Sequence, residues 1–190
     1  MERIYVEDKQ FEKIDFSTEP PEIAEYDNCS FVNCNFEKCD LSNISFSDCK
    51  FNGCNLTMIQ TVKTAFKDIK FNDCKLLGVH FEHCTDFLFA VQFENCILNY
   101  SSFFKKSLKK TVFRQSGLQE VDFTDADLSS AVFDKCDLNN AKFENTNLEK
   151  ADFRSAYNFS IDPALNRMRK ARFSMNGLPG LLNKFDIDIT

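Results

Sequence analysis

Large apolar residues recur at every fifth position along most of this 190-residue chain. These centres run from residue 31 to 81 and, after a slip of two residues, resume from 88 to 153. All of them are Phe or Leu except Thr61. A second small or apolar residue, such as Cys34 or Ala126, stands two positions before nearly every centre. The pattern therefore predicts that two of every five residues face inward and three face outward.

A spacing of five fits neither a continuous helix nor a continuous strand. On an α-helix each centre would rotate by about 140° from the last, and on a long strand successive centres would face opposite sides. A chain that turns a corner after every fifth position avoids both problems, because a centre and the residue two before it then point the same way. Four such sides close a square coil, and stacked coils form a solenoid.

Residue types sort by column when every fourth centre is compared, which is the spacing of one complete coil. One column is Phe throughout, and its members are Phe31, Phe51, Phe71, Phe93, Phe113, Phe133 and Phe153. Another column begins with Phe46 and Phe66 and assigns the next inward position to Leu88. The two-residue slip is then a bulge at one corner, near residues 84–87. These columns predict an all-β fold, a quadrilateral parallel β-helix.

Residues 126–130 read Ala-Asp-Leu-Ser-Ser, which matches the motif A(D/N)LXX. The motif and the columns resemble the pentapeptide-repeat family, and the resemblance implies that the β-helix is right-handed. Within that family the sequence resembles the Qnr-type quinolone-resistance proteins in its repeat, its columns and its apolar tail.

The regularity of the repeat divides the chain into three parts. Residues 1–30 keep the spacing only in places, and Pro20 and Pro21 interrupt it, which predicts an N-terminal cap and an irregular first coil. Residues 31–156 form the repeats with their bulge. Residues 157–190 are predicted to hold the last coil and a short helical cap.

The C-terminal part carries two helix signals. Asp162 and Pro163 have the pattern of an N-cap followed by Pro at the first helical position, which predicts a short helix over 163–169. Pro179, after Gly177, is predicted to open a final helix. The apolar residues of this tail are Leu178, Leu181, Leu182, Phe185 and Ile187. They either cap the last coil alone or also pair with a second copy, since the resemblance implies a homodimer formed end to end.

Composition narrows the classes of function. The net charge of −6 argues against direct binding of nucleic acid, because such proteins neutralise phosphates with Lys and Arg. The longest apolar runs are far too short to span a bilayer, and residues 1–5 carry no signal-peptide core. We therefore expect a cytoplasmic protein that has no membrane contact.

Eight of the nine cysteines stand two positions before a centre, and Cys84 does so when the first spacing of five is continued past Phe81. The nine are Cys29, Cys34, Cys39, Cys49, Cys54, Cys74, Cys84, Cys96 and Cys136. A free Cys is a small and commonly buried residue, so these thiols are predicted to fill the core. His80, Glu82 and His83 could in principle hold a metal, but a solvated corner is the simpler interpretation. Motifs for nucleophilic catalysis, phosphate binding or dinucleotide binding are missing. We expect no enzyme activity, no catalytic residue, no metal and no cofactor.

Outward positions turn apolar in one region, and the residues concerned are Met58, Val62, Leu77, Ile97, Tyr100 and Phe104. A contiguous exposed patch of this kind usually marks the binding surface for a partner. The alternative is that the bulge folds over these side chains and buries them.

The Qnr-type resemblance implies that the partner is DNA gyrase or topoisomerase IV, bound by a rod that mimics duplex DNA and so protects against quinolones. Coil steps of about 4.8 Å give a rod of roughly 34 Å, and duplex DNA of that length carries about 20 negative charges. A net charge of −6 is a poor electrostatic copy of it. Two functions stay open: a topoisomerase-binding protein that works by shape, and a rigid scaffold that binds an unrelated protein through the apolar residues.

Overall fold

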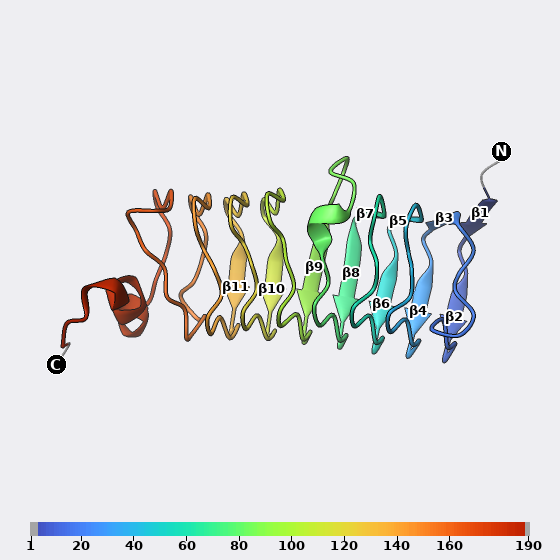
Figure 1. Cartoon of the computed structure of the whole chain (residues 1–190), viewed down its shortest axis with the longest axis horizontal. Coiled ribbons are helices and arrows are strands. Elements are labelled where there is room, and N and C mark those ends of the chain that lie inside the picture. Colours follow the sequence, from blue (N-terminus) through green and yellow to red (C-terminus); the bar gives the residue numbers. More distant parts are fainter. Residues whose placement is uncertain (1–3, 189–190) are drawn as a thin grey trace.

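The protein is a rod of stacked coils (Figure 1). The computed structural model describes residues 4–188. Residues 1–3 of the predicted N-terminal part and 189–190 of the predicted C-terminal part lie outside the described residues. The chain enters at one end of the rod, winds along it coil by coil, and ends beyond the last coil.

Short strands and 3-10 helices are the regular elements of the coils. Their bounds are β1 Ile4–Glu7, β2 Gln10–Glu12, β3 Ala24–Asp27, β4 Ser30–Val32, β5 Ser45–Ser47, β6 Lys50–Asn52, β7 Ala65–Lys67, β8 Ile69–Asn72, η1 Phe81–His83, β9 Val91–Glu94, β10 Val112–Arg114, β11 Val132–Asp134, η2 Met175–Leu181 and η3 Asn183–Phe185.

The strands form two parallel sheets on two sides of the coil. One sheet has the order β1-β3-β5-β7, and the other has the order β11-β10-β9-β8-β6-β4-β2. Partners lie one coil of four five-residue sides apart, as in Phe31 with Phe51. At the pairing of β8 with β9 this spacing grows by two, as in Phe71 with Phe93. Isolated parallel bridges continue the ladder on the other sides. The predicted parallel β-helix with a two-residue slip is confirmed.

Stacked phenylalanine rings fill the axis of the rod. The centroids of Phe93 and Phe113 lie 5.4 Å apart with 10° between the ring planes, and those of Phe113 and Phe133 lie 5.0 Å apart with 4°. The predicted column of rings is therefore confirmed. Phe173, which lies 20 residues after Phe153 and is expected to extend the column, stacks on Phe153 with ring centroids 5.2 Å apart. The column also begins one coil earlier than predicted, because Phe11 stacks on Phe31 with centroids 4.9 Å apart.

The corners between sides depend on the Asp or Asn that precedes a centre. The Oδ1 atom of Asp127 accepts a hydrogen bond from the main-chain N–H of Ser129 at 3.0 Å, which is an Asx turn. The next residue, Ser130, then takes a left-handed conformation with φ 60° and turns the chain. Asn147, one coil further on, donates from Nδ2 to the same Asp127 Oδ1 at 3.0 Å. The D/N position of the motif thus fixes a corner and links two coils.

The cysteine thiols fill the inward slots, as predicted. All nine are free and buried. A thiol or hydroxyl in such a slot also reaches a carbonyl of the preceding coil: Cys54 Sγ lies 3.3 Å from Phe31 O, and Thr146 Oγ1 lies 2.9 Å from Phe123 O. Burial raises the pKa of Cys49 to about 12, so this thiol stays protonated and unreactive.

The bulge is a loop over residues 84–90 that rises from one side of the rod (green, Figure 1). The prediction that Leu88 fills an inward position is wrong, because its side chain is 63% exposed. Leu88 makes a left-handed turn with φ 57°, which leaves its own side chain outside, and the following residue turns inward instead. The ring of Phe89 packs edge-on against Phe81 with centroids 6.3 Å apart.

The first coil is more regular than predicted. β1 pairs with β3 from Ile4–Ala24 onward, and β2 pairs with β4, so residues 4–16 already follow the register of the rod. Residues 17–23 leave the coil as a loop. Pro20 and Pro21 lie in this loop because they lack the N–H that a ladder requires. Over the described residues the predicted cap is therefore a coil with one looped side.

The predicted helix over residues 163–169 is wrong. Asp162 Oδ1 accepts a hydrogen bond from the Ala164 N–H at 2.8 Å, as an N-cap would, but the chain then makes a turn. It rejoins the ladder where Arg167 bridges to Asn147. The same Asx contact therefore starts a coil corner here instead of a helix.

The final helix exists as the 3-10 segments η2 and η3, and η2 begins at Met175, ahead of Pro179. It lies against the last coil through Gly180, where an added Cβ would come within 2.3 Å of Phe159 O. The Gly180 carbonyl accepts a hydrogen bond from Ile161 N–H at 2.9 Å. The predicted helical cap is confirmed, with this close glycine contact as its anchor.

We expect Phe113→Ala to lower the free energy of unfolding by about 3–5 kcal/mol, because it opens a cavity in a continuous column of buried rings. Asn139→Ala, at an exposed outward position of the next coil, is the control and should change it by less than about 0.5 kcal/mol. Urea unfolding measures both values. Equal effects of the two substitutions would contradict a rod held together through its axis.

Candidate protein-binding surfaces

Six outward side chains on neighbouring coils form what we call the apolar patch: Met58, Val62, Leu77, Ile97, Tyr100 and Phe104. Met58, Gly78 and Tyr100 take the same corner position on successive coils, with φ of 55°, 63° and 64°. A Cβ at Gly78 would lie 3.7 Å from Cγ of Met58, so the Met58 side chain reaches over this glycine.

Most of the apolar patch is open to solvent. Met58 is 56% exposed, Tyr100 60%, Val62 48% and Ile97 41%. Leu77 and Phe104 are half-buried. The bulge therefore does not cover the apolar patch, and four large apolar side chains stand free on a surface whose backbone is fixed by the ladder.

Glu82 stands in register between Val62 and Phe104, on the coil between theirs. Its Oε1 atom lies 2.8 Å from Nδ1 of His80, whereas its Oε2 atom is buried and has no hydrogen-bond partner. A buried carboxylate oxygen without a donor is destabilising. The rings of His80 and His83 stack at 5.6 Å. Within residues 4–188 no group of three or more His, Cys, Asp or Glu side chains is arranged to hold a metal.

The bulge is held to the next coil by a buried lysine. The side chain of Lys106 is 2% exposed, and its Nζ donates to Cys84 O at 2.5 Å and to Asp86 Oδ1 at 2.7 Å. Nζ also lies 4.9 Å from the centre of the Phe89 ring. The sequence placed this residue at an inward slot, where a charge is costly unless it is paired. The pairing with Asp86 and the hydrogen bond to Cys84 O compensate for the burial of the Lys106 charge.

A second apolar hollow lies on the outer face of the sheet β1-β3-β5-β7, and the sequence interpretation missed it. It measures about 480 Å³ and includes Ile23, Ser45, Ala65 and Phe87 in its lining. Ile23 is 66% exposed and Phe87 is 73% exposed. Both belong to loops without the five-residue repeat, so the pattern gave no reason to place them on one hollow. The small outward residues Ser45 and Ala65 are the signal in the sequence that marks this hollow.

The acidic side chains of the second half are paired along the rod. The Arg114 guanidinium forms ion pairs with the coils before and after its own. Nη1 lies 3.7 Å from Glu94 Oε1, and Nε lies 3.4 Å from Asp134 Oδ2. Hydrogen bonds from Arg154 hold the pKa of Asp152 below its usual range. These ion pairs reduce the negative charge that Glu94, Asp134 and Asp152 present on the rod.

The tail residues divide into two groups. Leu181 packs against the core and Leu182 is half-buried, so both serve the cap. Leu178, Phe185 and Ile187 are 38%, 57% and 56% exposed and contribute apolar surface at the end of the rod.

The fold and these surfaces define a class of protein, the quadrilateral β-helix built from five-residue repeats. Residues 86–157 match the family description "Pentapeptide repeat region", and residues 29–60 match "Pentapeptide repeats (8 copies)". Together the two matches cover more than half of the chain. The chain belongs to the pentapeptide-repeat family.

Several solved structures share the fold. A trypsin-treated variant of QnrB1, described as a plasmid-mediated fluoroquinolone resistance protein, is 15% identical with a TM-score of 0.63 and covers 100% of both chains. Full-length QnrB1 is 16% identical with a TM-score of 0.56, over 96% of this chain and 100% of the other. HetL, a protein of heterocyst differentiation regulation from the cyanobacterium Nostoc, is 14% identical with a TM-score of 0.47, over 92% and 88%. At these identities the likeness concerns the fold alone.

No curated protein sequence matches the chain. In the part of the chain that the structure describes, no helix has the length and apolar character needed to cross a membrane.

We expect Lys106→Met to speed hydrogen exchange of the bulge amides, such as Ala90 N–H, by at least about tenfold, since hydrogen bonds from a charged donor contribute about 1.5–3 kcal/mol. Exchange followed by mass spectrometry over residues 84–92 measures this. Lys109→Met on the same coil, at a 61% exposed side chain, is the matched control and should leave the exchange unchanged. Unaltered exchange in Lys106→Met would show that the bulge is held by its own contacts.

Proposed function

We propose that the protein is a non-enzymatic, rigid scaffold that binds a protein partner on the apolar patch. The observation that supports it is the exposure of large apolar side chains on consecutive coils of a rod with a filled axis. Burial of such a surface against a partner is favourable. Because the ladder fixes the backbone, binding loses little conformational entropy.

The apolar patch also favours one partner chemistry. Glu82 lies between Val62 and Phe104 and has one carboxylate oxygen without a donor. The Glu82 side chain is 20% exposed, so a partner that packs apolar side chains on the patch and brings an Arg or Lys beside them can pair with this carboxylate. A charge-assisted hydrogen bond of this type is stronger than a neutral one.

For the partner itself we infer a bacterial type II topoisomerase, DNA gyrase or topoisomerase IV, with protection from quinolones as the result. Support comes from the likeness in fold to QnrB1 over the full length of both chains. Such a partner requires a cytoplasmic protein. The net charge of −6 supplies little DNA mimicry, so this binding would depend on the shape of the rod and on apolar contacts.

A scaffold for an unrelated protein is the second candidate. The pairing of Arg114 with acidic residues on both neighbouring coils favours it, since a surface that imitates DNA would leave its negative charges unpaired. The apolar patch is the docking surface in both cases, so the two candidates differ in the partner and not in the site.

A supercoiling assay tests the topoisomerase proposal. Micromolar protein should alter supercoiling by purified gyrase or restore it in the presence of a fluoroquinolone, and the immobilised protein should retain a gyrase subunit. Ile97→Asp should weaken this binding at least about tenfold, as expected for a central interface residue. Its melting temperature should stay nearly unchanged, because Ile97 is 41% exposed.

Ile23→Asp is the matched control, since Ile23 is exposed on another side of the rod. If both variants bind like the unchanged protein, the apolar patch is not the docking surface. Absence of any effect on gyrase and topoisomerase IV, with neither enzyme retained, would exclude the topoisomerase and leave the second candidate. Loss of folding in Ile97→Asp would show that the patch is internal.

We also propose a homodimer formed end to end through Leu178, Phe185 and Ile187, which are the exposed apolar residues of the tail. Sedimentation velocity should give twice the 22.0 kDa of one chain. Phe185→Asp should shift the distribution to the single chain, whereas Leu88→Asp, an equally exposed change in the bulge, should not. A single-chain mass at all concentrations would show that the tail acts as a cap alone.

A further inference from the structure

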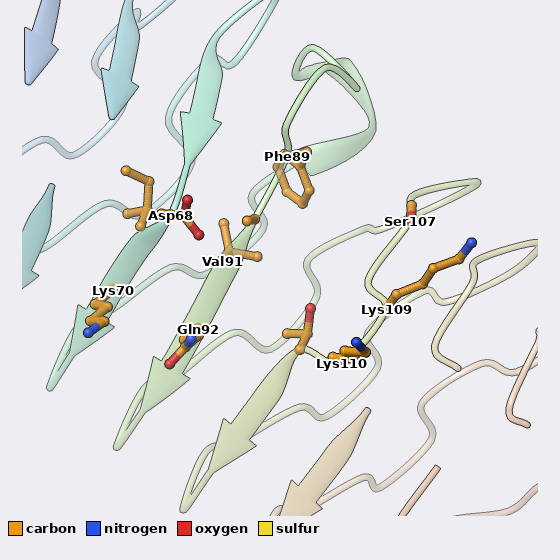
Figure 2. A pocket seen from close by; sticks show the side chains of 11 residues that line it. Asp68, Lys70, Phe89, Val91, Gln92, Ser107, Lys109 and Lys110 are labelled. Atoms are coloured by element: carbon orange, nitrogen blue, oxygen red, sulfur yellow. The ribbon is translucent and has the colours of Figure 1, made fainter. Parts of the chain in front are cut away.

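A cleft of about 310 Å³ opens between two coils beside the bulge (Figure 2). Phe89 and Val91 lie on one side of it, and Ser107, Lys109 and Lys110 lie on the next coil. Gln92 on β9 and Lys70 on β8, one coil before Gln92, also line the cleft. None of the surfaces described above includes these residues as a site.

The cleft exists because the ladder is interrupted at this point. Within the described residues, no main-chain hydrogen bond joins residues 84–90 to residues 105–111. On the next pair of coils the corresponding main-chain hydrogen bond is present, since Asp127 N–H donates to Lys106 O at 2.9 Å. Pairing of β9 with β10 begins only at Phe93–Phe113. The bulge therefore separates two coils over one side of the rod.

The interruption leaves main-chain groups at the cleft without partners. The carbonyl oxygens of Phe89 and Lys109 and the N–H of Ser107 make no main-chain hydrogen bond within residues 4–188. The carbonyl that Ser107 would reach in a regular coil, Cys84 O, is occupied by Lys106 Nζ. Main-chain donors and acceptors without partners are groups that an added extended segment can pair with.

The charge of the cleft is opposite to that of the whole chain. Its lining holds Lys70, Lys109 and Lys110 against Asp68 alone, whereas the chain carries −6. Lys109 also forms an ion pair outside the lining, with its Nζ 3.4 Å from Asp127 Oδ2. Lys70 and Lys110 are exposed and have no ion-pair partner in the described part of the chain. A ligand with negative charge is therefore favoured at this position.

We propose that this cleft binds an extended, acidic peptide segment of a partner protein. The lysines attract its carboxylates, the unpaired main-chain groups hold its backbone, and the partly buried Phe89 ring packs against its apolar side chains. An isolated phosphate would use the lysines but neither of the other two features. The cleft lies apart from the apolar patch, so this proposal does not depend on the topoisomerase proposal.

Fluorescence anisotropy with a labelled octapeptide of alternating Glu and Val tests the proposal, since this alternation places the carboxylates on one face and the apolar groups on the other. The peptide should bind, and the same peptide with Lys in place of Glu should not. Lys109→Glu with Lys110→Glu should weaken binding by about tenfold.

The matched control is Lys142→Glu with Lys150→Glu, which makes the same change of charge on exposed residues away from the cleft. Lys150 has the same corner conformation as Lys110, with φ of 60° and 61°. Deletion of Asp86 and Phe87, which places Leu88 five residues after Phe81 and restores the regular spacing of the centres, should close the ladder and abolish binding without lowering the melting temperature. If the melting temperature falls, Lys70→Glu replaces the deletion and should weaken binding in the folded protein.

Three results would overturn the proposal. One is equal binding by the cleft variant and the control variant. Another is displacement of the peptide by millimolar phosphate at constant ionic strength, which would make the cleft a simple anion site. The third is tighter binding of a labelled single-stranded oligonucleotide than of the acidic peptide.

Discussion

The structure depends on one constraint: each coil must place its side chains and its main-chain groups directly over those of the coil before. A coil of four equal sides achieves this. It stacks Phe on Phe along the axis, and it brings main-chain N–H groups within hydrogen-bonding reach of C=O groups on the neighbouring coil. The inward slot completes the arrangement, since a thiol or hydroxyl there reaches a carbonyl of the preceding coil. Ring stacking, ladder and slot all require the same register, so a change in one affects the others.

Much of the fold could be predicted because this register is written in the repeat itself. The column of rings, the buried thiols and the slip of two residues all follow from counting positions. The errors occurred where one local contact has two outcomes. Asp162 makes the hydrogen bond of an N-cap, but the same contact begins an Asx corner. Phe11 was missed because the loop with Pro20 and Pro21 hides the repeat on one side of the first coil.

The surfaces were less accessible to sequence reasoning. Side-chain alternation identified Met58, Ile97 and Tyr100 as outward residues, and their exposure in the structure agrees. Alternation fails within the bulge. A left-handed turn at Leu88 leaves that side chain facing solvent, and Phe89 faces inward in its place. The cleft could not be predicted at all, because it is made by hydrogen bonds that are missing between two coils, and the pattern of residues reports only which groups face inward.

The interrupted ladder has a mechanical consequence. In a stack where each layer holds only its neighbours, resistance to stretching is set by the weakest contact between layers. Between residues 84–90 and 105–111, Lys106 supplies polar links through Cys84 and Asp86 in place of main-chain rungs. When the rod is pulled from its two ends, we expect these two coils to separate first. Each half keeps its own main-chain hydrogen bonds and stacked Phe rings. The unfolding intermediate under tension would therefore consist of two folded segments.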